Sequence, residues 1–174
     1  LTKIRTDDGV LDFQEYFVRR RTEGHAWEVR FEGAEDAVPA PGVIEAISES
    51  EMVLLTPSNP IVSIGPILAV PGIRDALRAT DATVGAVSPI VGGKTLKGPA
   101  DRMLRDQGLA ASATTIASLY RDFLDVLVID SVDEALVPEI EALGVQAVVT
   151  DTIMASMEKK SALARTVLAA LSPK

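Results

Sequence analysis

The sequence contains no cysteine and one histidine, His25. The absence of cysteine excludes disulfides, thiolate nucleophiles and cysteine-bound zinc, and a single histidine excludes a multi-histidine metal cluster. Any metal ion would therefore be a hard, oxygen-bound ion such as magnesium. The sequence also lacks an apolar run of the roughly 18 residues that a membrane span needs, and the charged start LTKIRTDDG is unlike a signal peptide. We therefore expect a soluble, cytoplasmic protein.

Basic charge is scarce, because 25 acidic residues outnumber 17 lysines and arginines and give a net charge of -8. A duplex-binding protein needs a basic face, so this balance argues against nucleic acid as the main partner and leaves room for a small anion in a local basic pocket. A length of 174 residues with 47% hydrophobic content suits one domain. The chain opens on Leu1 inside a polar passage, which is typical of a fragment or a processed piece.

Short β-branched and apolar runs alternate with stretches of helical spacing from residue 51 onward. This rhythm predicts βαβ units with right-handed crossovers, and hence an α/β fold with a doubly wound, Rossmann-like parallel sheet. The predicted strands are 52–55, 83–87, 126–129 and 147–149. The predicted helices are 66–79, 99–107, 114–124, 133–143 and 156–171.

Residues 1–50 differ in texture and predict an α+β elaboration packed against a βα core formed by residues 51–174. LDFQEYFVRRR predicts a helix, and WEVRF alternates like a strand with Trp27 in the core. The loop AVPAPG would put Pro41 at a helix start. The side chains expected to point inward from the first helix are Leu11, Phe13, Tyr16 and Phe17.

Candidate ligand contacts follow the first predicted strand, in TPSNPIVSIGP. In an open parallel sheet, ligands bind beyond the carboxyl ends of the strands, where helix N-termini offer free N–H groups. The prolines would stiffen this loop, Ser58, Asn59 and Ser63 would supply short polar groups, and Gly65 would let the backbone approach an anion. An ordinary tight connection with a serine or threonine cap explains the same letters equally well.

The loop after the second strand, VSPIVGGKTLKGPADRML, combines Gly92 and Gly93 with two lysines, which also favours an anion site. It lacks the first glycine of a Walker A loop, and a lysine-containing loop of no function is the alternative. Arg19 and Arg20 could contact phosphate oxygens, although a solvated helix end is the simpler interpretation. Asp130 and Asp151 follow strands and are expected to be helix caps, and His25 is expected at the surface.

Five long strings together resemble the 2-phospho-L-lactate transferase family of coenzyme F-420 biosynthesis, including its phosphoenolpyruvate-using members. They are LDFQEYFVRRR, FEGAEDAVPAPGVIEAI, PSNPIVSIGPILAVPGIRDAL, VSPIVGGKTLKGPADRML and SLYRDFLDVLVID. The resemblance implies transfer of a phospholactyl or enolpyruvyl phosphate unit from a GDP-activated donor to the deazaflavin Fo, with release of GMP. It also implies magnesium (Mg2+) as cofactor and a homodimer.

The same resemblance implies that Ser58, Asn59, Ser63 and Gly65 lie at the nucleotide phosphates, together with Ser88, Gly92, Gly93 and Lys94. Family members begin with a glycine-rich strand-turn-helix and an aspartate for magnesium, and nothing here matches them. The chain therefore resembles the C-terminal part of such a transferase, with its metal and Fo residues elsewhere. Thr56 stands where the family usually has glycine. The alternatives are a non-catalytic nucleotide or sugar-nucleotide-binding regulatory protein of the related superfamily, and an interaction domain with no ligand.

Overall fold

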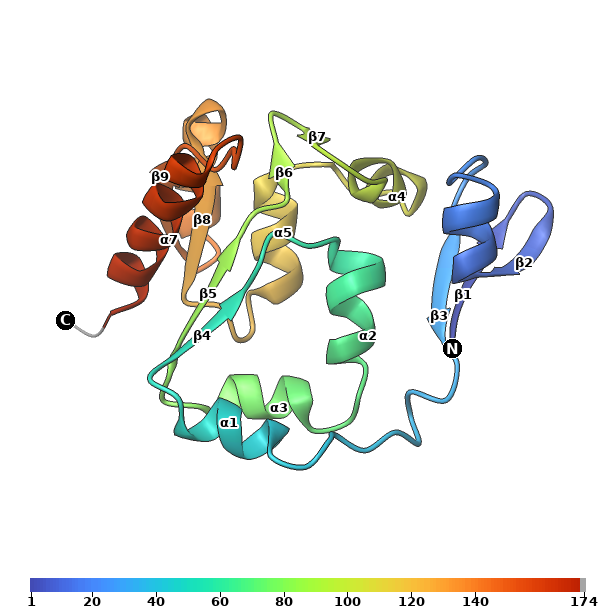
Figure 1. Cartoon of the computed structure of the whole chain (residues 1–174), viewed down its shortest axis with the longest axis horizontal. Coiled ribbons are helices and arrows are strands. Elements are labelled where there is room, and N and C mark those ends of the chain that lie inside the picture. The colour runs from blue at the N-terminus through green and yellow to red at the C-terminus, as the bar shows by residue number, and fades with distance from the viewer. Residues whose placement is uncertain (173–174) are drawn as a thin grey trace.

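The core of the protein is a four-stranded parallel sheet (Figure 1). Its strands are β4 (Met52–Leu55), β5 (Thr83–Val87), β8 (Val126–Asp130) and β9 (Gln146–Thr150), in the spatial order β4-β5-β8-β9. The structure, a computed structural model, describes residues 1–172. All four predicted strands are therefore confirmed, and because they are parallel their carboxyl ends meet at one edge of the sheet.

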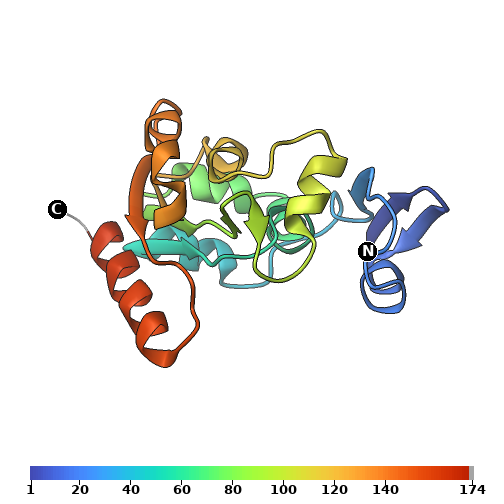
Figure 2. The ribbon, with the colours of Figure 1, turned by 90° about the horizontal axis from the view of Figure 1, so that it is seen from above.

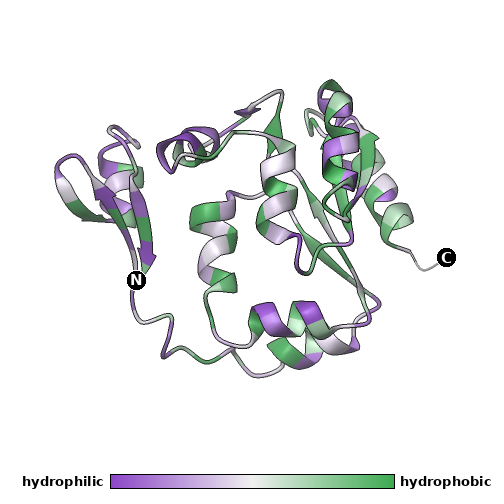
Figure 3. Ribbon diagram, turned by 180° about the vertical axis from the view of Figure 1, so that it is seen from behind, coloured by the Kyte–Doolittle hydropathy of each residue, from purple (hydrophilic) through white to green (hydrophobic). Residues whose placement is uncertain are grey.

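Helices cover both faces of this sheet, as predicted. One face carries α1 (Val43–Glu49), α3 (Ile73–Ala79), α5 (Ala113–Tyr120) and α6 (Val137–Glu141), which share a hydrophobic core with alternate strand residues such as Val84 and Leu127. The other face carries α7 (Met157–Leu171), as the view from above shows (Figure 2). The central strands are hydrophobic along most of their length (Figure 3), which is typical of strands buried on both sides.

Gly85, in the middle of β5, allows α7 to approach the sheet closely. A Cβ atom at this position would lie 2.6 Å from Cδ1 of Leu171. Leu171 is fully buried and packs in one cluster with Leu163, Val167, Val87 of β5 and the valines of β8. The position of α7, and of the loop that leads into it, is therefore fixed by contact with bare backbone.

Residues 2–31 form a separate antiparallel sheet, which we call the N-terminal module. Its strands β1 (Thr2–Thr6), β2 (Gly9–Asp12) and β3 (Glu28–Phe31) lie in the order β2-β1-β3, and the π-helix η1 (Glu15–Arg19) follows β2. The predicted helix over 11–21 is thus too long, because Leu11 pairs with Ile4 in a hairpin that the sequence analysis missed. Of the expected inward residues, Tyr16 is fully buried.

Two aromatic core predictions in this module are wrong. Phe17 is 41% exposed and Trp27 is 45% exposed. Trp27 Nε1 donates a hydrogen bond to Asp7 Oδ1 at 2.8 Å, and its ring stacks on His25 with centroids 4.7 Å apart. An indole can satisfy its N–H at the surface while one ring face stays covered, so strand alternation alone did not locate it.

The connections between the strands are more broken than predicted. The single helix expected over 66–79 is instead the π-helix η2 (Pro60–Ile64), α2 (Gly65–Leu68) and α3. Pro71 lacks the N–H that a continuous helix needs, and Gly72 adopts φ 88°. The segments Pro60–Leu68 and Ile73–Ala79 consequently meet at 84°. Within residues 1–172, no single helix is long and apolar enough to cross a membrane, although these two bent segments taken together meet that criterion by length and composition.

The remaining elements follow the predicted order with shorter bounds. The segment expected at 99–107 is α4 (Ala100–Asp106), preceded by a small hairpin of β6 (Ile90–Val91) and β7 (Lys94–Thr95). The helix expected over 114–124 ends at Tyr120, and the helix expected over 133–143 is a 3-10 helix, η3 (Ser131–Leu136), followed by α6. Pro41 precedes α1, whose N-cap is Gly42.

Helix α4 attaches the N-terminal module to the core. Arg102 donates hydrogen bonds to the phenolic oxygen of Tyr16 at 3.0 Å and to the carbonyl of Thr22. One turn later, Asp106 accepts the backbone N–H of Ala26, and its other oxygen lies 2.8 Å from His25 Nδ1. His25 is exposed, as predicted, but it has a carboxylate partner that its loop sequence did not reveal.

The carboxylate of Asp122, which follows α5, binds two arginines. Because Asp122→Asn removes this charge, we expect it to lower the free energy of unfolding at pH 7 by about 2 kcal/mol. Its carboxylate accepts bonds from Arg74 at 2.6 Å and Arg78 at 2.6 Å. The Arg74 hydrogen bonds lower the pKa of Asp122 to about 2. The carboxylate therefore stabilises the fold above its ordinary pKa near 4, and this contribution is lost as the pH falls toward 2.

Urea unfolding at pH 7 and at low pH measures the difference in the free energy of unfolding between wild type and Asp122→Asn. Asp75→Asn is the matched control, because Asp75 meets the same Arg78 from the exposed surface and should change stability by less than about 0.5 kcal/mol. An equal loss in the two variants would contradict a special role for Asp122.

The His25–Asp106 contact predicts a pH dependence of opposite sign. The hydrogen bond to Asp106 raises the pKa of His25 above its usual value. Protonated His25 therefore stabilises the fold through this ion pair. The stabilisation is complete below about pH 6.5 and disappears as the pH rises through the folded-state pKa of His25. The difference in Tm between wild type and His25→Asn should be larger at pH 6 than at pH 8.5. Because His25 is the one histidine of the chain, its NMR titration reports the folded-state pKa directly, and a value at or below 6.5 would refute the ion pair.

Candidate functional site

A groove of about 1120 Å3 lies at the carboxyl edge of the parallel sheet. It runs from the N-terminal module, across the loops that follow β4 and β5, to the loop between β9 and α7; we call it the strand-end groove. This is the place where open parallel sheets bind ligands. Its lining comprises Phe13, Phe17, Pro57, Ser58, Asn59, Val62, Ser63, Ser88, Pro89, Val91, Thr95, Leu96, Lys97, Gly98, Pro99, Ala100, Thr152, Ile153, Met154, Ala155 and Lys160.

The charge of this lining is opposite to that of the chain. Lys97 and Lys160 are its charged residues, and no aspartate or glutamate is among its described members, although the protein carries a net charge of -8. Within the described part of the chain, ion pairs engage Lys3 and Lys159 but neither groove lysine. The two ammonium groups are thus available to a ligand, and the groove has the electrostatics of an anion site.

In the loop after β4, the side chain of Asn59 binds the backbone of the same loop. Asn59 Oδ1 accepts the backbone N–H groups of Ile61 at 2.9 Å and Val62 at 3.3 Å, which makes it the N-cap of η2. Its Nδ2 donates to the sulfur of Met103 at 3.6 Å. Ser58 and Ser63 also line the groove, and Ser63 is exposed. The predicted residues Ser58, Asn59 and Ser63 therefore lie together, with the serine hydroxyls better placed to donate to a ligand.

Of the residues predicted in the loop after β5, one lines the groove and three do not. Ser88 is buried in the groove wall, where its hydroxyl donates to the carbonyl of Ile90 at 2.9 Å. Gly92 and Gly93, with φ 57° and 76°, form the two-residue turn of the β6–β7 hairpin. The N–H of Gly92 donates to both oxygens of buried Asp133, at 3.2 and 3.0 Å. Gly92, Gly93 and Lys94 are absent from the groove lining, and the glycines have a structural reason for their conformation.

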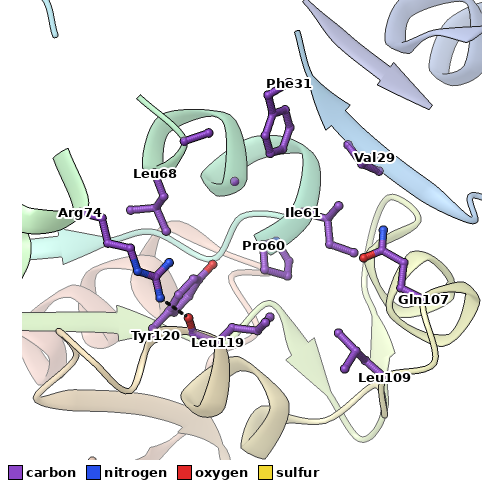
Figure 4. A pocket seen from close by; sticks show the side chains of 12 residues that line it. Val29, Phe31, Pro60, Ile61, Leu68, Arg74, Gln107, Leu109, Leu119 and Tyr120 are labelled. Atoms are coloured by element: carbon purple, nitrogen blue, oxygen red, sulfur yellow. Dashed lines mark hydrogen bonds between the residues drawn. The ribbon is translucent and has the colours of Figure 1, made fainter. Parts of the chain in front are cut away.

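Gly65 lines a second cavity, of about 360 Å3. Phe31, Pro60 and Tyr120 line the same cavity (Figure 4). A Cβ on Gly65 would lie 2.9 Å from Cζ of Phe31, so this glycine permits contact between α2 and the N-terminal module. The cavity is mostly apolar, with Arg74 bound to the carbonyl of Leu119 at 2.9 Å. Gly65 thus lines a different cavity from the one that Ser58, Asn59 and Ser63 line.

The two arginines predicted as phosphate contacts lie outside the groove lining. Arg20 pairs with Asp8 at 2.6 Å and with Glu15 at 3.7 Å, and Arg19 is exposed at the end of η1. The structure therefore places Arg20 in an ion-pair network of the N-terminal module itself.

The acidic residues at the ends of β8 and β9 position the floor of the groove. Buried Asp130 caps η3 by accepting Val132 N–H, as expected, and also accepts the N–H and hydroxyl of Thr152 at 2.9 and 3.0 Å. Asp151 accepts Ile153 N–H and pairs with Lys159, whereas the cap of α7 is Ser156. Asp130 thus spans the ends of β8 and β9 and holds Thr152 in the groove wall.

The groove does not offer the ligands that magnesium prefers. Mg2+ is bound through carboxylates and phosphate oxygens, and the lining supplies hydroxyls, amides and ammonium groups. Across residues 1–172, no group of three or more acidic or histidine side chains is arranged to hold a metal ion. The described lining of the groove therefore does not fit a protein-bound magnesium ion.

Sequence reasoning missed several groove residues. Lys160 and Thr152 are far from the glycine-rich loops in sequence and reach the groove because β9 is parallel to the other strands and ends at the same edge of the sheet. Phe13 and Phe17 were expected in the core. The parallel-strand rule could have pointed to the loop after β9, but nothing in the sequence separates Lys160 from its neighbour Lys159.

Comparison with known proteins identifies relatives of this chain. Residues 1–169 match the family described as 2-phospho-L-lactate transferase CofD. The chain is 44% identical over 165 residues to a 2-phospho-L-lactate transferase of Methanothermobacter thermautotrophicus, covering 95% of this chain and 52% of the relative. It is also 44% identical over 160 residues to a phosphoenolpyruvate transferase of Kitasatospora aureofaciens, covering 91% of this chain and 50% of the relative.

A solved structure shares the fold at low identity. Protein BH3568 of Bacillus halodurans, described as a member of the UPF0052 family, matches with a TM-score of 0.63 and 15% identity over 96% of this chain and 58% of that one. The chain spans about half the length of the curated relatives it matches. The family match over residues 1–169 and the agreement with both kinds of transferase show that this chain belongs to the CofD family of 2-phospho-L-lactate transferases.

Proposed function

We propose that the strand-end groove is part of the active site of a transferase that moves a phospholactyl or enolpyruvyl phosphate unit from a GDP-activated donor to the deazaflavin Fo, with release of GMP. The observation that carries this proposal is a groove at the strand ends of an acidic protein whose described lining has no carboxylate and whose two lysines pair with no described acidic residue. Family membership supports the same chemistry, because relatives of both names are about equally similar to this chain.

The groove residues divide into those that contact phosphate and those that shape the loops. Lys97 and Lys160 offset the charge of a diphosphate, and the hydroxyls of Ser58 and Ser63 donate to its oxygens. Asn59 and Ser88 hold the loops that carry these donors. The site acts by positioning and by electrostatic stabilisation, as in other phosphoryl transfers.

The reaction needs no covalent intermediate with the protein. The acceptor hydroxyl oxygen forms a bond to the phosphorus that carries the lactyl or enolpyruvyl group. The bond from that phosphorus to the bridging oxygen breaks, and GMP leaves with this oxygen while the hydroxyl proton is released. In this proposal Lys97 and Lys160 act on the phosphate oxygens, which carry more negative charge as the bridging bond breaks. Among residues 1–172, those that line the groove include no carboxylate or imidazole that could act as a general base.

Magnesium and the homodimer remain predictions from the family resemblance. Because the lining has no carboxylate, we derive no step through a metal ion. The alternative, a nucleotide-binding protein without transfer activity, shares the fold but predicts no Fo-dependent GMP release. Identity of 44% to named transferases favours catalysis over this alternative.

Substitution of the groove lysines tests the proposal. Lys97→Met and Lys160→Met should each weaken GDP binding by about tenfold, because each removes a charge-assisted contact to phosphate. Isothermal titration of GDP measures the change. Lys94→Met is the informative comparison, since Lys94 is exposed on the hairpin outside the lining. A larger loss with Lys94→Met than with the groove lysines would move the phosphate site to the hairpin, and unchanged affinity in all three variants would overturn the proposal.

A further inference from the structure

The N-terminal module forms one wall of the strand-end groove, since Phe13 and Phe17 belong to it and line the groove. Within the described residues, one segment, 32–42, joins the module to α1. We propose that the module is a movable wall. It pivots on the last turn of α4 between the arrangement in the structure and a second one, and this movement changes the width of the groove.

The turn that follows η1 is strained in the observed arrangement. Arg21 and Thr22 adopt φ 49° and 62°, and they are the non-glycine residues with positive φ among residues 1–172. This region is costly for any residue with a Cβ, and most of all for a β-branched threonine. Two contacts impose it, because Thr22 N–H donates to the carbonyl of Tyr16 at 2.8 Å and the Thr22 carbonyl accepts from Arg102 of α4. Arg102 therefore holds the module against the local preference of the chain.

Two buried donors at the same junction have no partner. Among residues 1–172, the buried side-chain nitrogens without a hydrogen-bond partner are Nε of Arg102 and Nε2 of Gln107, which directly follows α4. Buried donors in native proteins almost always have partners, so each exception needs an explanation. Strand β3 pairs with β1 alone, and its other edge therefore carries backbone carbonyls that can accept. A shift of β3 toward α4 would bring such an acceptor to Gln107.

The second cavity gives the module room for this shift. Val29 and Phe31 of β3 line it together with Gln107 (Figure 4), and its volume is about 360 Å3. A well-packed interface has few voids larger than a water molecule. In the cavity wall, Phe31 contacts the bare backbone of Gly65, so no side chain at that position interlocks with the ring. Because the module lines both the cavity and the groove, closing the cavity changes the groove.

Asp106 is the pivot, because its contacts require no strained backbone. Its Oδ2 accepts the N–H of buried Ala26 at 2.8 Å, and its Oδ1 lies 2.8 Å from Nδ1 of His25. Arg102, one turn earlier, is the contact that releases, since its bond to Thr22 depends on the strained turn and its own Nε stays unpaired. This inference does not depend on the identity of the ligand and so goes beyond the proposed function.

Spin labels measure the movement directly, because the chain has no native cysteine. Val18→Cys on the module and Leu168→Cys on α7 are exposed positions outside the groove lining. Double electron–electron resonance between these labels should give one major distance, with a second distance in at most about a tenth of the molecules. Arg102→Met removes the releasing contact and should make the second distance the major one. Arg102→Lys, which loses the guanidinium fork, serves if Arg102→Met does not fold.

Arg105→Met is the matched control. Arg105 also lies on α4, but it is bonded to Asp101 and to the carbonyl of Gly93 and not to the module. The label distances should therefore be the same in Arg105→Met as in the parent chain. Unchanged distances in a folded Arg102 variant, or an equal change in the Arg102 and Arg105 variants, would overturn the movable wall.

Thr22→Gly distinguishes a movable wall from a merely loosened attachment. Glycine adopts positive φ without steric cost, so Thr22→Gly alone should raise the Tm by about 3 °C. In the Arg102→Met background it should return about half of the molecules to the original distance, because the observed arrangement is no longer strained. Thr22→Ala keeps the Cβ and should restore less. If glycine restores no more than alanine, strain does not drive the movement and the inference is wrong.

Discussion

Parallel pairing of β4, β5, β8 and β9 is the constraint on which the groove depends. Parallel strands bring their carboxyl ends to one edge, so loops that are up to a hundred residues apart in sequence meet there. Side chains then fix the ends against one another. Asp125 accepts the N–H of Val84 at 2.7 Å where β8 begins, and Asp130 joins the end of β8 to Thr152. The groove is therefore set by the sheet, and its loops adjust within that frame.

Several small polar residues of the groove bind backbone groups of their own loops. Asn59 caps η2, and the hydroxyl of Ser88 donates to the carbonyl of Ile90. Buried backbone groups need partners, and short polar side chains supply them where tight loops leave no ladder. The consequence is a division of labour, in which these residues build the shape while the lysines and the remaining hydroxyls face the ligand.

The sequence predicts the sheet well because buried strands are continuous apolar runs that end at turn residues. It predicts the helices less well, since Pro71 and Gly72 interrupt a pattern whose spacing alone suggests one helix. The hairpin of β1 and β2 was not predicted, because TKIRT mixes polar and apolar residues without a clear core face. These failures arise where tertiary contacts override a local pattern.

The candidate site divides along the same line. Ser58, Asn59, Ser63 and Ser88 were found in the groove because they lie in the segments that follow β4 and β5, and that rule depends on topology alone. Gly92 and Gly93 also follow a strand, but a two-residue hairpin requires φ > 0 just as a phosphate loop does, so the letters do not distinguish the two. The sequence did not predict Phe17 as a groove residue for a related reason. A phenylalanine on a predicted helix is assigned to the core unless the surface that it faces is known.

The N-terminal module and the parallel sheet contribute opposite ends of one groove, so their attachment matters for any ligand that spans it. That attachment runs through α4, where Arg102 binds Tyr16 and Asp106 binds the backbone of Ala26. These are charge-assisted contacts, and they are stronger and more directional than the apolar packing around them. The same helix packs against η2 through Met103, which touches Asn59. A shift of α4 would therefore move the N-terminal module and the loop after β4 together, and would change their distance from Lys160.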